Sequence, residues 1–207
     1  MKRYVLAALC ALAAFCLILP AEAALFGKEE MKRMSVFISN FTELGFYDLD
    51  VENESDGALY LGGPDAAPDL IRFGILHNYV NNFKSRVRKC AAKNCGHGSL
   101  TLEGKFVQES VKKYFDLNLK NQSVVDSDPP YYFDGKRYHF EGADGEAVYY
   151  AEVKEASREG GVVTMSGELY NAEDKKDRPA TFRAVAKPYK WNGKDTWAIL
   201  SLRSEFN

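Results

Sequence analysis

The C-terminal part of the chain carries a series of segments whose side chains alternate between apolar and polar. In one segment three apolar residues oppose two basic ones: Phe182, Ala184 and Ala186 against Arg183 and Lys187. A period of two residues is typical of a half-buried β-strand, and turn-forming sequences separate each segment from the next. The segments are residues 146–156, 162–172, 180–190 and 196–206. They predict an antiparallel meander, preceded by a hairpin in which residues 131–133 and 137–140 flank Asp134-Gly135.

Two segments upstream have the period of amphipathic helices. The first covers residues 70–87, with Asp69 as its N-cap after Pro68. Its apolar stripe holds Phe73, Leu76, Tyr79, Val80, Phe83 and Val87, and its polar side holds Gly74, Asn78, Asn81, Asn82 and Ser85. The second covers residues 105–115, where Val107, Val111 and Tyr114 share a face.

The remaining N-terminal sequence gives weaker signals. Residues 24–33 are a polar lead-in or short helix, and residues 34–47 are richer in strand-forming side chains. Residues 48–68 are acidic and rich in Gly and Pro, which predicts a long surface loop. The alternating acids from Asp48 to Asp56 suggest calcium, but an EF-hand loop starting there would have Asn53 in place of its glycine, so a solvated acidic loop is the prediction.

A helix followed by four or five antiparallel strands is the element order of a curved sheet wrapped around one helix. In this order residues 99–206 resemble the cystatin-like superfold, shared by cystatins and nuclear-transport-factor-like proteins. The resemblance implies an α+β fold in which the helix at residues 105–115 packs on a curved antiparallel sheet, with an additional N-terminal helical segment. It implies no activity, because the Gln-x-Val-x-Gly hairpin of cystatins is absent from the sequence.

The first 23 residues have the three parts of a secretory signal peptide. Lys2 and Arg3 precede an apolar run over residues 5–19, and a small-x-small cleavage site ends at Ala23. The apolar run is shorter than the roughly 20 residues that a membrane-spanning helix needs. We therefore expect an exported protein, periplasmic or secreted, with no membrane span after cleavage, and the compact Met-Lys-Arg start favours a bacterial host.

The predicted organisation is a signal peptide at residues 1–23, an N-terminal segment at 24–98 and a helix-and-meander unit at 99–207. Loss of the leader removes two cations and one anion, which changes the formal net charge from −2 to −3. A nucleic-acid partner normally requires a basic face, so it is not expected.

Cys90 and Cys95 are the cysteines that remain after cleavage. Export to an oxidising compartment favours a disulfide between them, closing a small loop after the first helix. The alternative is a zinc site formed with His97 and a fourth ligand, His77 or His139. Because that set is incomplete in the local sequence, the disulfide is the prediction, and neither a metal nor another cofactor is expected.

Two groups of residues are candidates for ligand binding. His77, Asn78, Asn81 and Asn82 offer hydrogen-bond donors and acceptors on the first helix, although a polar helix face can serve solubility alone. Tyr149, Tyr150 and Trp197 represent the aromatic residues of the sheet, which either line a concave pocket or pair across strands in the core.

The sequence contains no Gly-x-Ser-x-Gly, His-Glu-x-x-His or phosphate-binding loop motif. The predicted function is therefore a non-catalytic binding module of the bacterial envelope, acting on a protein partner or a small ligand. An inhibitor or regulator of an envelope hydrolase is the first alternative, and a small enzyme with a pocket in the sheet is the second.

Overall fold

The computed structural model describes residues 26–92, 95–142 and 148–207, so the predicted leader lies outside the described residues. These residues form an α+β fold, and none of their helices is long and apolar enough to cross a membrane. The helices are α1 (Lys28–Thr42), α2 (Ala67–Asn81) and α3 (Gly104–Phe115). The strands are β1 (Leu49–Asp50), β2 (Leu59–Tyr60), β3 (Arg88–Lys89), β4 (Leu100–Glu103), β5 (Tyr132–Phe133), β6 (Arg137–Phe140), β7 (Tyr149–Glu159), β8 (Val162–Asn171), β9 (Ala180–Trp191) and β10 (Lys194–Phe206).

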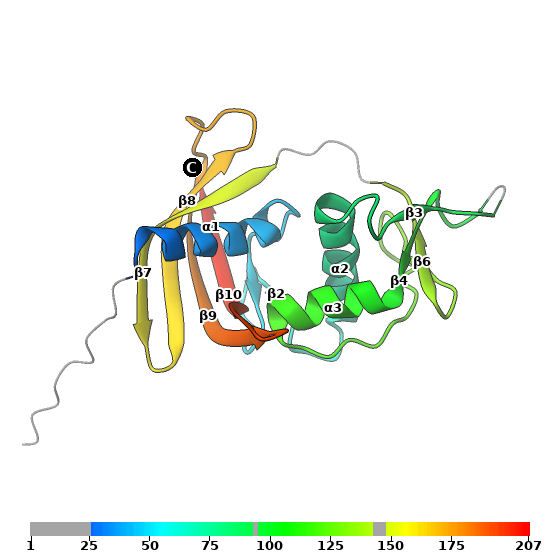
Figure 1. The fold of residues 1–207 in the computed structure, drawn as a ribbon, viewed down its shortest axis with the longest axis horizontal. Helices are drawn as coiled ribbons and strands as arrows, with labels where there is room; N and C mark the ends of the chain where they lie inside the picture. The colour runs from blue at the N-terminus through cyan, green and yellow to red at the C-terminus, as the bar shows by residue number, and fades with distance from the viewer. Residues whose placement is uncertain (1–25, 93–94, 143–147) are drawn as a thin grey trace, which may run out of the picture.

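The strands form a larger and a smaller sheet. The larger has the order β2-β1-β10-β9-β8-β7 and is antiparallel except where β1 pairs with β2. The smaller has the order β3-β4-β6-β5 and is antiparallel throughout. The larger sheet, with α1 against it, lies at one end of the molecule and the smaller sheet at the other, with α2 and α3 between them (Figure 1).

Helix α1 covers one edge of the larger sheet, the edge formed by β7. Strand β7 is the terminal strand, so its outer N–H and C=O groups face away from β8 and need other partners. Three hydroxyl side chains of α1 supply them, and we call this set the hydroxyl ladder. Its contacts are Ser35 Oγ with Val153 N (2.9 Å), Ser39 Oγ with Ala151 N (2.9 Å) and Thr42 Oγ1 with Tyr149 O (2.7 Å).

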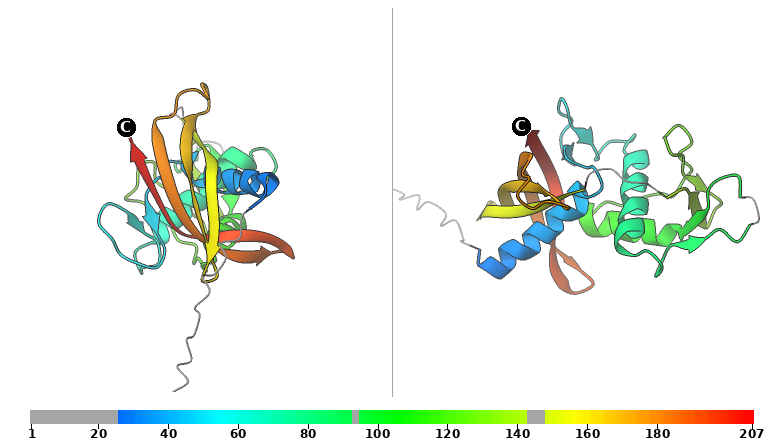
Figure 2. Two further views of the ribbon diagram at one scale, coloured as in Figure 1. Left: turned by 90° about the vertical axis from the view of Figure 1, so that its left-hand side faces the viewer. Right: turned by 90° about the horizontal axis from the view of Figure 1, so that it is seen from above.

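Next to the ladder, α1 presents an apolar stripe to the core. Met34, Phe37, Ile38 and Phe41 are buried and recur every three or four residues, which is the spacing of one helix face. The Phe37 ring lies 5.7 Å from the Trp197 ring on β10, so α1 also packs over the middle of the sheet. Figure 2 shows α1 running alongside the strands of the larger sheet.

The strand-forming composition of residues 34–47 did not indicate their structure. Most of them belong to α1, because the apolar spacing is helical even though the composition favours strands. The stretch at residues 48–68 was also more than a loop, since β1 and β2 form there and Leu49 and Leu61 are buried. Strand β1 pairs with β10 at Leu202 and Ser201, and so covers part of the β10 edge.

The helix expected over residues 70–87, with Asp69 as its N-cap, instead begins at Ala67, with Ala66 as its N-cap, and ends at Asn81. Val80 and Phe83, expected in the apolar stripe, are 50% and 47% exposed, and residues 88–89 form β3. The side assigned as polar is instead packed against α3, where Gly74 and Asn78 are buried. The prediction of one apolar stripe assumed that the helix has a single buried face, whereas α2 is buried on two faces.

The helix lying along the sheet is α1, and not residues 105–115 as expected. Helix α3 packs mainly against α2, and its main contact with the larger sheet is at β10. The boundary expected between residues 98 and 99 falls inside the β3–β4 hairpin, where Cys90 N–H donates to Ser99 O at 2.8 Å. The N-terminal elements α1 and β1 pack on β7 and β10 from the C-terminal half, so the two predicted segments are interleaved in space.

Other predicted elements are confirmed. Helix α3 buries Val107, Val111 and Tyr114 as expected, and β5 and β6 form the hairpin around Asp134-Gly135. Strands β7 to β10 form the meander. The β9–β10 turn at Asn192 and Gly193 has φ values of 50° and 77°, the left-handed conformation that this residue pair favours.

The contact between α2 and α3 predicts a strongly unfavourable substitution. A Cβ atom on Gly74 would lie 2.6 Å from Val107 Cγ1 and 3.0 Å from the Val107 carbonyl oxygen. Gly74→Ala should lower the free energy of unfolding by about 1–3 kcal/mol through overpacking, although alanine favours helices. Gly27→Ala, which meets no atom within 4 Å, is the control. Urea denaturation of both variants tests this, and a neutral Gly74→Ala would contradict the close packing.

Candidate functional site

Hollows lie on both sides of α1, separated by an exposed row of side chains. This row, which we call the α1 ridge, consists of Lys28, Lys32 and Val36, spaced one helical turn apart on the outside of α1. The hollows beside it have volumes of about 380, 410 and 460 Å³, and Lys32 lines all three. The side chain of Val36 is 60% exposed.

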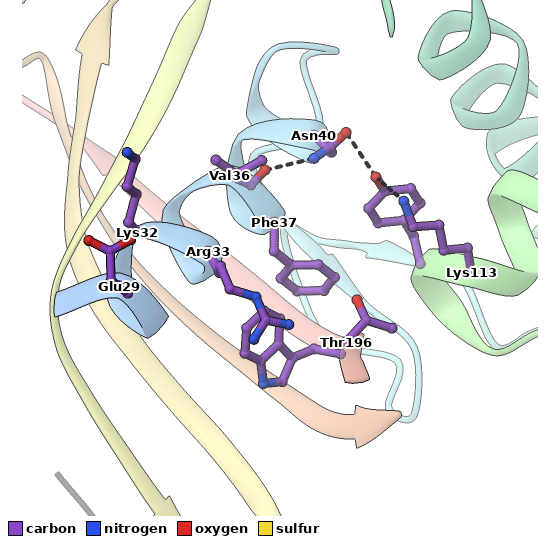
Figure 3. A pocket seen from close by; sticks show the side chains of 10 residues that line it. Glu29, Lys32, Arg33, Val36, Phe37, Asn40, Lys113 and Thr196 are labelled. Carbon is purple, nitrogen blue, oxygen red and sulfur yellow. Dashed lines mark hydrogen bonds between the residues drawn. The ribbon is translucent and has the colours of Figure 1, made fainter. Parts of the chain in front are cut away.

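The hollow of about 380 Å³ lies between α1, α3 and β10. Its floor is aromatic, with Phe37 next to both Trp197 and Tyr114. The Arg33 guanidinium lies 5.3 Å from the centre of the Trp197 ring, and Lys113 stands opposite on α3 (Figure 3). Desolvation lowers the pKa of Lys113, with a further contribution from Arg86.

The hollow of about 410 Å³ lies between α1 and strands β7 and β8 and is basic. Four cations line it, namely Lys28, Lys32, Lys175 and Arg178, against the single acid Glu152. Arg178 is paired with Glu152 at 2.6 Å and with Glu168 at 2.9 Å. Among the described residues Lys32 has no ion-pair partner, so its charge is available to a ligand.

The hollow of about 460 Å³ brings together two residues singled out from the sequence, Asn81 and Tyr150. Asn81 Nδ2 donates to Glu43 Oε1 at 2.7 Å. Burial raises the pKa of Glu43, and this hydrogen bond offsets part of the effect. Trp197 lines other hollows, while Tyr149 packs edge-to-face against Tyr47 and Phe206.

His77 and Asn78, also singled out, are buried in a polar network between the helices. Their exposed fractions are 6% and 0%. Asn78 Nδ2 donates to Ser110 Oγ at 2.9 Å, and Ser110 Oγ lies 3.0 Å from His77 Nδ1. Both side chains are thus engaged internally, and Asn82 caps the C-terminus of α2 through its backbone.

The network fixes the protonation of His77. Tyr114 donates its hydroxyl hydrogen to Asn40 Oδ1 at 3.0 Å, so it accepts from His77 Nε2–H at 3.2 Å. Nδ1 of His77 is then free to accept from Ser110. Desolvation, with smaller contributions from Lys113 and Arg86, lowers the pKa of His77 to about 3, so the imidazole is neutral at physiological pH.

This Ser–His pair differs from a catalytic one in accessibility. Ser110 is 3% exposed and His77 6%, so a substrate has no route to the hydroxyl. A general base also works best with a pKa near the operating pH. The pair joins α2 to α3 and, through Tyr114 and Asn40, to α1.

A second cluster lies on the outer side of the smaller sheet. Cys90 Sγ, Cys95 Sγ and His139 Nδ1 all lie within 4.8 Å of one another. His139 Nε2 lies 3.0 Å from Asp134 Oδ2. The two cysteines are free thiols in this structure, so the disulfide stays a prediction. His97, the histidine nearest in sequence, stacks on Tyr132 at 3.9 Å between ring centres.

The groups of this cluster shift each other's pKa. The hydrogen bond from His139, with two backbone N–H groups, lowers the pKa of Asp134 to about 2. Partial burial disfavours the His139 imidazolium, but Asp134 and Cys95 outweigh it and raise the pKa of His139. The backbone N–H of His97 lowers the pKa of Cys95. The hydrogen bond between the two thiol groups lowers the pKa of Cys95 further and raises that of Cys90.

Sequence reasoning missed the α1 ridge and the role of Asp134. A helical reading of residues 28–42 would have placed Lys28, Lys32 and Val36 in one row. Asp134 was read only as part of a turn. Its spacing of five residues from His139 in a hairpin allows contact across the strands, but many hairpins share that spacing.

Comparison with models of known protein families, with characterised proteins and with solved structures gives no match for this chain.

The depressed pKa of His77 predicts an acid-sensitive fold. Between pH 6.5 and about 3, the unfolded chain binds a proton at His77 that the folded chain does not, so stability is lost as pH falls through this range. The slope from this group should reach about 1.4 kcal/mol per pH unit. Urea denaturation from pH 7 to 4 should show this slope in the wild type and its reduction in His77→Gln. An NMR titration of His77 with a midpoint near 6.5 would contradict the prediction.

Proposed function

We propose that this chain is an exported, non-catalytic binding module of a bacterial cell envelope, periplasmic or secreted. Its binding surface is the α1 ridge together with the hollows beside it. The occupant is an acidic segment of a protein partner that carries an apolar side chain to cover Val36. The observation that carries the proposal is Lys32, an unpaired cation among the described residues that lines the hollows on both sides of an exposed apolar residue.

Charge supports an acidic partner. The chain without residues 1–23 has a formal net charge of −3, yet Lys28, Lys32 and Lys175 gather at one hollow. A local cationic surface on an acidic protein favours encounter with an anionic segment and fixes its orientation. Arg33 and Lys113 extend the same charge into the neighbouring hollow.

Shape supports a protein segment over a small ligand. Small-molecule sites usually enclose most of the ligand surface. Here the hollows flank a protruding ridge, and a segment laid across α1 would contact several hollows at once. None of the three histidines of the sequence lines these hollows, which favours binding over acid–base chemistry.

The proposed fold is cystatin-like, but the helix that lies against the sheet is a different one from the helix expected. The element order that supports it is α1 lying against the meander of β7 to β10, with α2, α3 and the smaller sheet inserted between them in the sequence. In this proposal α1 takes the place that residues 105–115 were expected to fill.

Site-specific photocrosslinking tests the surface. A photoreactive phenylalanine analogue at Val36, in cells that produce the protein, should give one discrete adduct with an Asp- and Glu-rich segment of another envelope protein. The same analogue at Val125, which is 66% exposed and lines none of these hollows, is the control and should give no adduct.

Charge reversal then tests the role of Lys32. Lys32→Glu should reduce the Val36 adduct at least tenfold, because the like charge repels the acidic segment. Lys120→Glu, at an exposed position away from the ridge, should leave it unchanged. Equal adducts from positions 36 and 125, or an adduct insensitive to Lys32→Glu, would reject the proposed surface.

A further inference from the structure

The cluster on the smaller sheet has the dimensions of a metal site. His139 Nδ1 lies 3.6 Å from Cys90 Sγ and 3.3 Å from Cys95 Sγ. In a tetrahedral zinc site with Zn–S near 2.3 Å and Zn–N near 2.0–2.1 Å, sulfur and nitrogen ligands lie about 3.5 Å apart. One ion between these three atoms would therefore be at ligand distance from each with little movement.

The smaller sheet places two of the three ligands. His139 is in β6 and pairs with Thr101 of β4, while Cys90 directly follows β3 on the other side of β4. The backbone bond from Cys90 N–H to Ser99 O, at 2.8 Å, holds the cysteine at the end of this hairpin. The neighbouring residues Tyr138 and Phe140 are buried, so β6 is anchored in the core and His139 faces outward.

Asp134 orients the imidazole for ligation. Its Oδ2 accepts from His139 Nε2–H at 3.0 Å, which leaves the Nδ1 lone pair directed at the sulfur atoms. Its Oδ1 accepts the backbone N–H groups of Lys136 and Arg137 at 2.8 and 2.7 Å, so the carboxylate itself is fixed. A carboxylate on the distal nitrogen is the usual companion of a metal-binding histidine.

We propose that Cys90, Cys95 and His139 bind one zinc ion, oriented by Asp134. Two thiolates and an imidazole suit this borderline-soft cation, whereas magnesium and calcium require oxygen ligands. The two thiolate charges balance the charge of the ion. The fourth position is open to solvent or to a further ligand, because the cluster offers three ligand atoms among the described residues.

This proposal competes directly with the disulfide expected from export, because each uses both sulfur atoms. A disulfide would give no role to an imidazole nitrogen that approaches both sulfurs, or to the carboxylate behind it. A bound zinc ion gives a role to all four groups, with the two thiolates and the imidazole as ligands and the carboxylate orienting the imidazole.

Metal titration of the full, reduced chain under anaerobic conditions is the first test. Zinc should bind one ion per chain, and both thiols should resist alkylation until a chelator is added. Cobalt, as a spectroscopic probe, should give sulfur-to-metal charge-transfer absorption and the visible bands of a tetrahedral site. Absence of uptake by the reduced chain, or a preference for copper(I) that excludes zinc, would overturn the proposal.

Substitutions test the geometry. His139→Gln should abolish the cobalt spectrum. Asp134→Asn keeps an oxygen for the backbone N–H groups but loses the acceptor for Nε2–H, and should weaken zinc binding by about 10- to 100-fold. Asp50→Asn is the matched control, since Asp50 Oδ1 accepts the N–H groups of Glu52 and Asn53 in the same way without a histidine. Unchanged affinity in His139→Gln would overturn the site.

The state of the pair in the producing cell completes the test. Protein trapped rapidly from cells should contain two thiols that react only after chelation. A disulfide between Cys90 and Cys95 in the trapped protein would overturn the zinc assignment and support the original expectation.

Discussion

The hydroxyl ladder between α1 and β7 determines where the rest of the molecule can lie. An edge strand presents backbone groups that otherwise pair with another chain. Here serine and threonine hydroxyls on one face of a helix satisfy them, with contacts spanning 112 and 118 residues of sequence for Ser39 and Ser35. Helix α1 is held beside the sheet by these bonds and over it by Phe37, which packs against Trp197. The α1 ridge and its hollows exist because α1 stands in this position and exposes its remaining face.

The same helix connects the two ends of the molecule. Phe41 packs against Phe73 of α2 at 5.3 Å and against Tyr114 of α3 at 5.7 Å between ring centres. Tyr114 in turn links Asn40 to His77 by hydrogen bonds. Buried polar networks of this kind are costly unless every member is satisfied, and here neutral His77 is used as both donor and acceptor. The smaller sheet lies beyond α2 and α3, so the cysteine cluster and the α1 ridge are separate sites on one framework.

Local signals determined which elements the sequence could predict. The strands of the meander were recognisable because alternation and turns such as Asn192-Gly193 depend on neighbouring residues only. The position of α1 was not recognisable, because the hydroxyl ladder joins α1 to a strand that is distant in the sequence. His77 and Asn78 were expected at a surface because a single-stripe reading leaves no second buried face for α2. The sequence indicated only part of the cysteine cluster. The two thiols could be identified, but the choice of His139 over His97 depends on the register of β4 with β6.

Amide hydrogen exchange on β7 tests the hydroxyl ladder most directly. The N–H groups of Ala151 and Val153 point to α1, and those of Tyr150 and Glu152 point to β8, because alternate residues of an antiparallel strand face opposite neighbours. Ser39→Ala leaves the Ala151 N–H without its acceptor, at a cost of about 1–3 kcal/mol. Exchange at Ala151 should accelerate at least tenfold, while Tyr150 and Glu152 remain protected. Unchanged protection of Ala151, or equal acceleration at all of these amides, would contradict the account.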